Sequence, residues 1–147
     1  MPEILTALKT KFPSLSEEAN TRYLIADIKD IKKICQFLKE NLNFPHLACI
    51  TSIDYKDKLA LAYSLYSYAL KEKITVKIFL DKNNPSVESV TSIWSAANWH
   101  EREAFDMMGI NFIGHPDLRR ILLPDDFVGH PLRKDYTNEH LLRMPAI

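Results

Sequence analysis

The residue types most able to do chemistry gather in the last third of the chain, beginning with the segment NWHEREAFDMMG at 98–109. This segment places three carboxylates and a histidine around one guanidinium. Because Arg102 and Asp106 are four residues apart, they share a helical face and can pair. His100 and Glu103 have a spacing that metal ligands use, but the second histidine of the HExxH zinc motif is absent. The pattern therefore favours ion pairs, within the chain or at an interface, over a metal site.

Three further histidines, His115, His130 and His140, are candidates for general acid–base catalysis. A catalytic histidine needs a nucleophile or an orienting partner. No G-x-S-x-G motif is present, and neither cysteine is near these histidines in the sequence. Both His115 and His130 stand between a glycine and a proline, where an imidazole commonly bonds to the backbone of a turn. We favour that role, with an independent enzyme built on His115 or His130 as an alternative.

Two similar phrases follow the charged segment, GHPDLRR at 114–120 and GHPLRK at 129–134. Their cations are Arg119, Arg120, Arg133 and Lys134. These cations could hold phosphates, but aspartates stand among them and glycine-rich phosphate loops are absent. Arginine is well suited to pair with carboxylates across a desolvated interface. We predict that each GHP bends the chain and that the following leucine and cations hold an arm against a carboxylate-bearing surface, on a partner or on the chain's own domain.

Composition narrows the function classes. The chain has 147 residues, with 19 Lys and Arg balancing 19 Asp and Glu. Zero net charge disfavours a nucleic-acid-binding module and an acidic membrane surface as partner, and favours a subunit over a free monomer. Cys35 and Cys49 fall in apolar patterns, so free thiols are expected, with no cysteine-ligated cluster or zinc in this chain. The N-terminus lacks a signal-peptide core and no apolar run could span a membrane, which predicts a reducing, cytosol-facing compartment.

The first part of the chain predicts helices and strands in a compact α+β unit. Residues 2–11 form a short amphipathic pattern, and the apolar run 22–27 predicts a strand. The next helix carries its apolar residues at helical spacing, with Asp27 or Asp30 as cap. These apolar residues are Ile31, Ile34, Cys35, Leu38 and Leu42.

Three strand candidates come next, at 46–55, 59–70 and 73–80, with a hairpin turn between the first two. The third alternates, which predicts a sheet covered on one face and wetter on the other. After a loop at 81–86, helical spacing returns from Val87.

The following helix is expected to be capped by Asn98 with Glu101 in a capping box, and to end at Gly109. Residues 110–147 hold the other two glycines and four prolines. They predict an irregular arm whose large apolar groups pack against the chain's own domain or against a neighbouring protein. The expected fold is α+β, a small mixed or antiparallel sheet flanked by helices. Residues 1–109 form the globular domain and 110–147 an irregular C-terminal arm that docks partners.

The stretch EREAFDMMGINFIGHPDLRRILLPDDFVGHPLRKDY resembles the signature of the thirty-kilodalton subunit family of respiratory complex I, the family of the C subunit of bacterial NADH–quinone oxidoreductase. The ending G-x-P-L-R-K-D-Y matches at 129–136. The other matching positions are Glu101, Arg102, Glu103, Asp106, Met107, Met108, His115, Arg119, Ile121 and Leu122.

The resemblance implies a non-catalytic peripheral-arm subunit of a proton-translocating complex, without flavin, iron–sulfur cluster or quinone chemistry of its own. FMN, iron–sulfur clusters and quinone would belong to partner subunits. The implied partner is the large, hydrogenase-like subunit that helps form the quinone site. The implied place is the cytoplasmic side of the bacterial plasma membrane, reached only through the complex. Related modules in membrane-bound hydrogenases, formate hydrogenlyases and dehydrogenases with other donors keep the donor open.

From the charged helix and the arm we predict a subunit interface with no catalytic, cofactor-binding or metal-binding residue in this chain. The predicted interface residues are Glu101, Arg102, Glu103, Asp106, His115, Arg119, Arg120, Arg133, Lys134, Asp135 and Tyr136.

Overall fold

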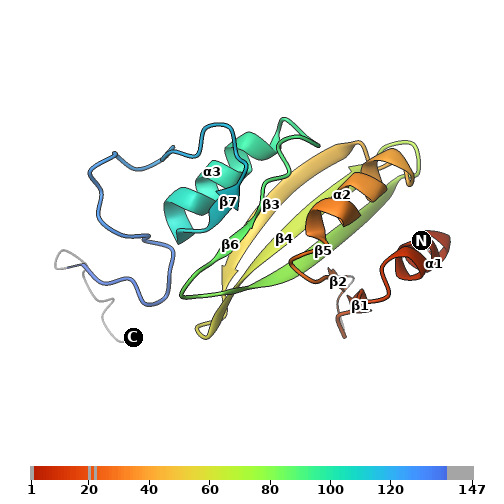
Figure 1. Cartoon of the computed structure of the whole chain (residues 1–147), viewed down its shortest axis with the longest axis horizontal. Helices are drawn as coiled ribbons and strands as arrows, with labels where there is room; N and C mark the ends of the chain where they lie inside the picture. The colour runs from red at the N-terminus through yellow and green to blue at the C-terminus, as the bar shows by residue number, and fades with distance from the viewer. Residues whose placement is uncertain (1, 20, 22, 139–147) are drawn as a thin grey trace, which may run out of the picture.

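A computed structural model describes residues 2–19, 21 and 23–138, and its fold is mixed α+β (Figure 1). Its helices are α1 (Pro2–Lys11), α2 (Ile31–Glu40) and α3 (Ala97–Met108). Its strands are β1 (Ser16–Glu17), β2 (Tyr23–Ile25), β3 (His46–Asp54), β4 (Lys58–Ser67), β5 (Glu72–Asp81), β6 (Ser86–Glu88) and β7 (Asn111–Ile113). The predicted fold class is confirmed, as are the helix at 2–11 and the strands of the first half.

The main sheet has the strand order β1-β2-β5-β4-β3 and is mixed. β3, β4 and β5 are antiparallel neighbours, whereas β2 runs parallel to β5. The predicted hairpin joins β3 to β4, where the N–H of Tyr55 donates to the carbonyl of Lys58 at 2.9 Å. The alternation of β5 fixes both that strand and its buried face. β3 and β4 were predictable from their apolar runs and the short polar break between them.

The core lies between one face of the sheet and the helices α2 and α3. Ile34, Cys35 and Leu38 of α2 are fully buried, opposite the apolar rows of β4 and β5. α3 lies against β3, the edge strand of the sheet (Figure 1). Both cysteines are free thiols, Cys35 buried and Cys49 half-buried.

The second face of the sheet is drier than the alternation predicted. Lys77 of β5 is only 2% exposed, although it belongs to the polar row of that strand. Its ammonium donates to Glu18 at 2.6 Å and to the Tyr55 hydroxyl at 3.3 Å. Burial alone would lower the pKa of Lys77, but these partners outweigh it and raise the pKa. The predicted alternation of β5 is therefore confirmed, but the prediction that its polar row faces solvent is wrong at Lys77. Glu18, from outside the strand, covers this side chain.

Two elements differ from the sequence-based expectation. Helical spacing from Val87 predicted a helix, yet Ser86–Glu88 is the strand β6, paired in parallel with β7. β7 lies at 111–113, within the segment predicted to be irregular, so that prediction is wrong for these three residues. Val87 and Phe112 face each other in this pair and both are buried. From residue 114 to 138 the chain has no helix or strand, as predicted. Residues 139–147 of the predicted arm, with the candidate His140, lie outside the described residues.

The side-chain caps predicted at the helix starts are absent from α2 and α3. α3 begins at Ala97, and its N-cap Ala96 makes no side-chain capping bond, so the Asn98 cap is wrong. Asp30 stands at the N-cap of α2 but its side chain makes no capping bond either. Gly109 ends α3 as predicted, with a φ of 69° in the left-handed region that glycine tolerates.

Candidate partner-docking site

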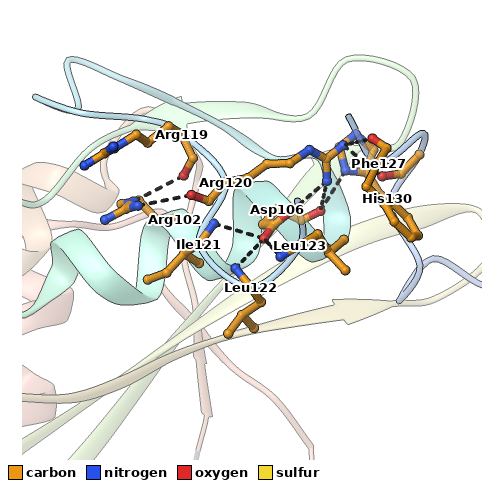
Figure 2. A network of polar contacts seen from close by, with 10 residues as sticks. Arg102, Asp106, Arg119, Arg120, Ile121, Leu122, Leu123, Phe127 and His130 are labelled. Atoms are coloured by element: carbon orange, nitrogen blue, oxygen red, sulfur yellow. Dashed lines mark hydrogen bonds and ion pairs between the residues drawn. The ribbon is translucent and has the colours of Figure 1, made fainter. Parts of the chain in front are cut away.

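The predicted interface residues converge on α3 and on the segment 114–138, called the arm here. At the centre is Asp106, whose side chain is fully buried on α3. Its Oδ2 accepts three consecutive backbone N–H groups, from Ile121 at 3.1 Å, Leu122 at 2.8 Å and Leu123 at 2.9 Å (Figure 2). Burial would raise the pKa of Asp106, but these bonds and the Arg120 guanidinium outweigh it and lower the pKa. The ionised carboxylate is thus the anchor of the arm.

Arg120 extends this anchor to the far side of the arm. Its Nη1 donates to Oδ1 of Asp106 at 2.7 Å, and its Nη2 donates to the carbonyls of Phe127 at 3.0 Å and Gly129 at 3.1 Å (Figure 2). Charge-assisted bonds of this kind are stronger than neutral ones. One guanidinium therefore fixes both ends of the loop between residues 120 and 129.

Arg102 does not pair with Asp106, so that part of the sequence-based prediction is wrong. Its Nε donates to the carbonyl of Arg119 at 3.2 Å and its Nη2 to the carbonyl of Arg120 at 3.1 Å. The guanidinium also lies 5.3 Å from the ring centroid of Trp99, an exposed side chain. The carboxylate of Asp106 already accepts hydrogen bonds from four donors of the arm. Arg102 instead donates to backbone carbonyls of the arm.

Glu101 is also buried, but it makes no capping box. Its carboxylate accepts the hydroxyl of Ser89 at 2.6 Å and the N–H of Val90 at 2.7 Å, which ties α3 to the segment after β6. Burial dominates at this site and raises the pKa of Glu101 above its usual range. The pKa values of the two buried carboxylates of α3 are thus shifted in opposite directions.

Both GHP histidines bond to backbone, as the sequence predicted. Nδ1 of His115 accepts the N–H of Asp117 at 2.9 Å, and Nε2 lies 3.3 Å from the carbonyl of Asn98. Nδ1 of His130 bonds the carbonyl of Asp106 at 2.9 Å. A carbonyl can only accept, so Nδ1 of His130 is the donor in this bond.

The second phrase of the arm is held by contacts that sequence reasoning missed. Arg133 Nε donates to the carbonyl of Met108 at 2.7 Å, and the N–H of Lys134 donates to Asp54 at 2.8 Å. Asp54 is a buried carboxylate at the end of β3, which also pairs with Lys82 at 3.3 Å. Its only sequence signal is an acidic residue at the end of a strand, a pattern too common to single it out.

The predicted interface residues differ in their exposure to solvent. Those turned toward the chain itself are Glu101, Arg102, Asp106, His115, Arg120 and Arg133. Those exposed to solvent are Glu103, Arg119, Lys134 and Asp135. Tyr136 is half-buried and stacks on Phe127, with ring centroids 6.2 Å apart.

The exposed surface around this anchor is partly apolar, which the sequence did not reveal. Five large apolar side chains of α3, β7 and the arm are exposed: Trp99, Ile113, Leu122, Val128 and Leu132. A groove of about 360 Å³ lies between β3 and α3, and Leu132 lines it with Cys49 and His100. Within residues 2–19, 21 and 23–138, no three His, Cys, Asp or Glu side chains gather as metal ligands do. None of the described helices has the length and apolar composition of a membrane span.

Comparison with known proteins identifies relatives over most of the chain. Residues 24–140 match the family model described as respiratory-chain NADH dehydrogenase, 30 kDa subunit. The C subunit of NADH-quinone oxidoreductase from Moorella thermoacetica is 44% identical over 140 residues, covering 92% of this chain and 95% of the relative. The C subunit of F420H2 dehydrogenase from Methanosarcina mazei is 38% identical over 141 residues, covering 90% and 89%.

A solved structure has the same fold. A chain of the membrane-bound sulfane sulfur reductase, an archaeal respiratory membrane complex, superposes with a TM-score of 0.80 at 26% identity. The match covers 92% of this chain and 85% of that one.

Proposed function

This chain belongs to the family of the 30 kDa subunit of respiratory-chain NADH dehydrogenase, and on that premise we propose that it is a docking subunit of a quinone-reducing respiratory complex. Its partners are the large, hydrogenase-like subunit of the quinone site and other peripheral-arm subunits. The complex holds the chain at the cytoplasmic face of the membrane. FMN, iron–sulfur clusters and quinone are bound by those partners, and this chain contributes no catalytic residue.

The observation that carries the proposal is an ordered arm that leaves apolar side chains in solvent. Irregular segments keep a fixed shape only when their backbone groups are bonded, and Asp106 and Arg120 provide those bonds here. Val128 is 86% exposed, Leu122 63% and Trp99 62%. Five of the nine large apolar side chains exposed among the described residues belong to α3, β7 and the arm. Trp beside Arg is typical of the energetic centres of interaction sites.

Two features support a docking role over an independent enzyme. The imidazoles of His115 and His130 are engaged by backbone groups of the chain itself. The carboxylate nearest to His115, that of Glu101, lies 3.9 Å away and already accepts two hydrogen bonds. If the purified chain alone turned over a substrate, and mutation of either histidine abolished that turnover, the docking role would be wrong.

Affinity purification of the complete complex tests the proposal. A tagged wild-type chain is expected to recover the large subunit together with quinone reductase activity. Combined Trp99→Ala and Leu122→Ala substitutions should lower recovery of the large subunit about tenfold or more, since central interface residues each contribute on the order of 1 to 2 kcal/mol. Tyr68→Ala is the control, because Tyr68 is equally exposed but lies outside α3 and the arm. A wild-type chain that recovers no redox subunit would contradict the proposal.

We propose NADH as the electron donor, following the NADH-quinone oxidoreductase relatives. The F420H2 dehydrogenase relative, of nearly equal length, favours a second candidate, the same docking role in a complex with another donor. The purified complex should be assayed for quinone reduction with NADH and with F420H2. Activity with NADH alone supports the first candidate, and activity with F420H2 alone supports the second.

A further inference from the structure

Three of the four arginines of α3 and the arm bond to the chain's own backbone. Arg102, Arg120 and Arg133 all donate to backbone carbonyl oxygens of α3 or the arm. Arg102 is buried, and Arg120 and Arg133 are half-buried. These cations therefore hold the arm in shape through bonds to the chain's own backbone and to Asp106.

The charges that remain outside are mostly acidic. The exposed charged residues of α3 and the arm are Glu103, Asp117, Asp125, Asp126 and Asp135 against Arg119 and Lys134. Two of the aspartates already have partners: Asp117 pairs with Arg119 at 2.9 Å, and Asp135 with Lys82 at 3.4 Å.

Asp125 and Asp126, adjacent in sequence, make no hydrogen bond or ion pair with any other described residue. They stand at the centre of a turn, in which the N–H of Phe127 donates to the carbonyl of Pro124 at 3.0 Å.

This turn is rigid on both sides. Asp106 binds the N–H groups of residues 121–123 before it, and Arg120 binds the carbonyls of Phe127 and Gly129 after it. Leu122 and Val128 flank it and are exposed. A loop already held in one conformation loses little entropy on binding. The segment 122–128 therefore presents two carboxylates, unpaired among the described residues, between two apolar side chains in a fixed arrangement.

We propose that the segment 122–128, here called the acidic turn, inserts into an arginine- or lysine-bearing, apolar-lined depression on a sister subunit of the complex. Charge complementarity selects this occupant, because cations must neutralise Asp125 and Asp126 once water is displaced. An anionic lipid surface would be repelled by the same carboxylates. The inference rests on the proposed docking function. The sequence left open whether the arm cations meet carboxylates of a partner or of the chain's own domain; Arg120 meets Asp106 of α3, and the charge proposed to face the partner is acidic.

Zero-length carbodiimide cross-linking of the intact complex locates the occupant. The reagent joins a carboxylate to an amine only where the two are in contact. Trypsin releases the acidic turn in the peptide 121–133. Mass spectrometry is expected to find this peptide joined to a lysine peptide of one sister subunit. Absence of that product, in a complex whose sister subunits are otherwise cross-linked, would rule out a lysine-bearing occupant. An arginine-bearing occupant would remain, and charge variants of the acidic turn test it.

Neutralising the acidic turn tests lysine and arginine occupants alike. Asp125→Asn with Asp126→Asn should weaken retention of the sister subunit about tenfold at 0.15 M salt, with the difference shrinking at high salt. Glu40→Lys is the matched control, since it changes the net charge by the same two units at the end of α2.

The result separates this inference from the proposed function. If the wild-type complex forms and the double variant retains its partner at every salt concentration, the acidic turn is not a docking element, although the subunit role stands. If anionic vesicles bind the wild-type chain more tightly than neutral vesicles, the protein occupant is also wrong.

Discussion

Two carboxylates on one helix show how little the residue type alone determines. Glu101 and Asp106 are both fully buried on α3. Asp106 receives three backbone N–H groups and a guanidinium, which favour the ionised form. Glu101 receives one hydroxyl and one N–H, which do not offset the cost of burying its charge. Ionised Asp106 therefore stabilises the fold, whereas ionisation of Glu101 costs folding free energy.

Asp106→Asn is expected to destabilise the chain and free the arm. The amide has the shape of the carboxylate but cannot pair with Arg120 or accept all four donors, so the free energy of unfolding should fall by about 2 to 3 kcal/mol. Glu101→Gln should stay within about 1 kcal/mol of wild type, because an amide can accept from Val90 and donate to Ser89 without a buried charge. Urea unfolding measures both variants. Equal losses in the two would contradict the opposite roles assigned here.

The same contrast predicts a pH dependence. The pKa of folded Asp106 lies below that of the unfolded chain. Its contribution to stability is therefore complete above the unfolded value of about 3.9 and is lost as the pH falls through the folded pKa.

The difference in unfolding free energy between wild type and Asp106→Asn should accordingly be constant near neutral pH and shrink below about pH 4. The pH dependence contributed by Glu101 has the opposite sign. Because the pKa of Glu101 is raised in the folded chain, its ionised form destabilises the fold, and this cost disappears as the pH falls and the carboxylate is protonated. A wild-type to Asp106→Asn difference that grows on acidification would show that Asp106 is not the ionised anchor.

At the scale of elements, glycine positions fix how the arm leaves α3. Gly109 and Gly114 both have positive φ, 69° and 81°. A Cβ built on Gly109 would lie 2.6 Å from Cδ2 of His130, whereas one on Gly114 would meet nothing within 4 Å. The close approach of His130 to the end of α3 therefore depends on the missing side chain.

Gly109→Ala should cost more stability than Gly114→Ala. The second variant carries only the strain of a left-handed alanine, about 1 kcal/mol. The first adds a clash with an imidazole that is itself hydrogen-bonded to Asp106, and about 2 to 3 kcal/mol is expected in total. Thermal unfolding compares the two, and hydrogen exchange should show faster exchange in residues 127–133 of Gly109→Ala only. Similar behaviour of both variants would rule out the packing role of Gly109.

The sequence predicted those elements that have a local signal. Alternation marked β5, apolar runs around a short polar break marked β3 and β4, and apolar spacing marked α2. β6 was missed because three residues cannot show a period, and its pairing with β7 joins residues about 25 positions apart. The start of α3 was missed because its N-cap is an alanine without a capping bond.

The candidate site was predicted in its members but not in its connections. The charged residues were found, yet Arg102 and Asp106 were paired with each other when both bind the arm backbone. Which donor fills a carboxylate depends on how an irregular segment folds back, and no periodicity encodes that. The second anchor, Asp54 with Lys134, joins residues 80 positions apart and left no local trace.

At the scale of the whole molecule, one set of residues holds the arm in its conformation and a different set is exposed for recognition of a partner. Side chains that resemble a charged interface in sequence are used to hold the arm, and the surface left over is apolar and acidic. This division explains how a chain of zero net charge can have a surface that is acidic and apolar in one region. It also predicts which groups become protected on assembly.

Hydroxyl-radical footprinting of the free chain and of the assembled complex tests this most directly. Trp99 is 62% exposed in the isolated chain and Tyr68, outside α3 and the arm, is 67% exposed. The docking role predicts that oxidation of Trp99, Leu122 and Val128 falls at least several-fold in the complex, and that the fall at Trp99 exceeds that at Tyr68. Oxidation of Trp99 and the acidic turn at the same rate in both states would contradict it.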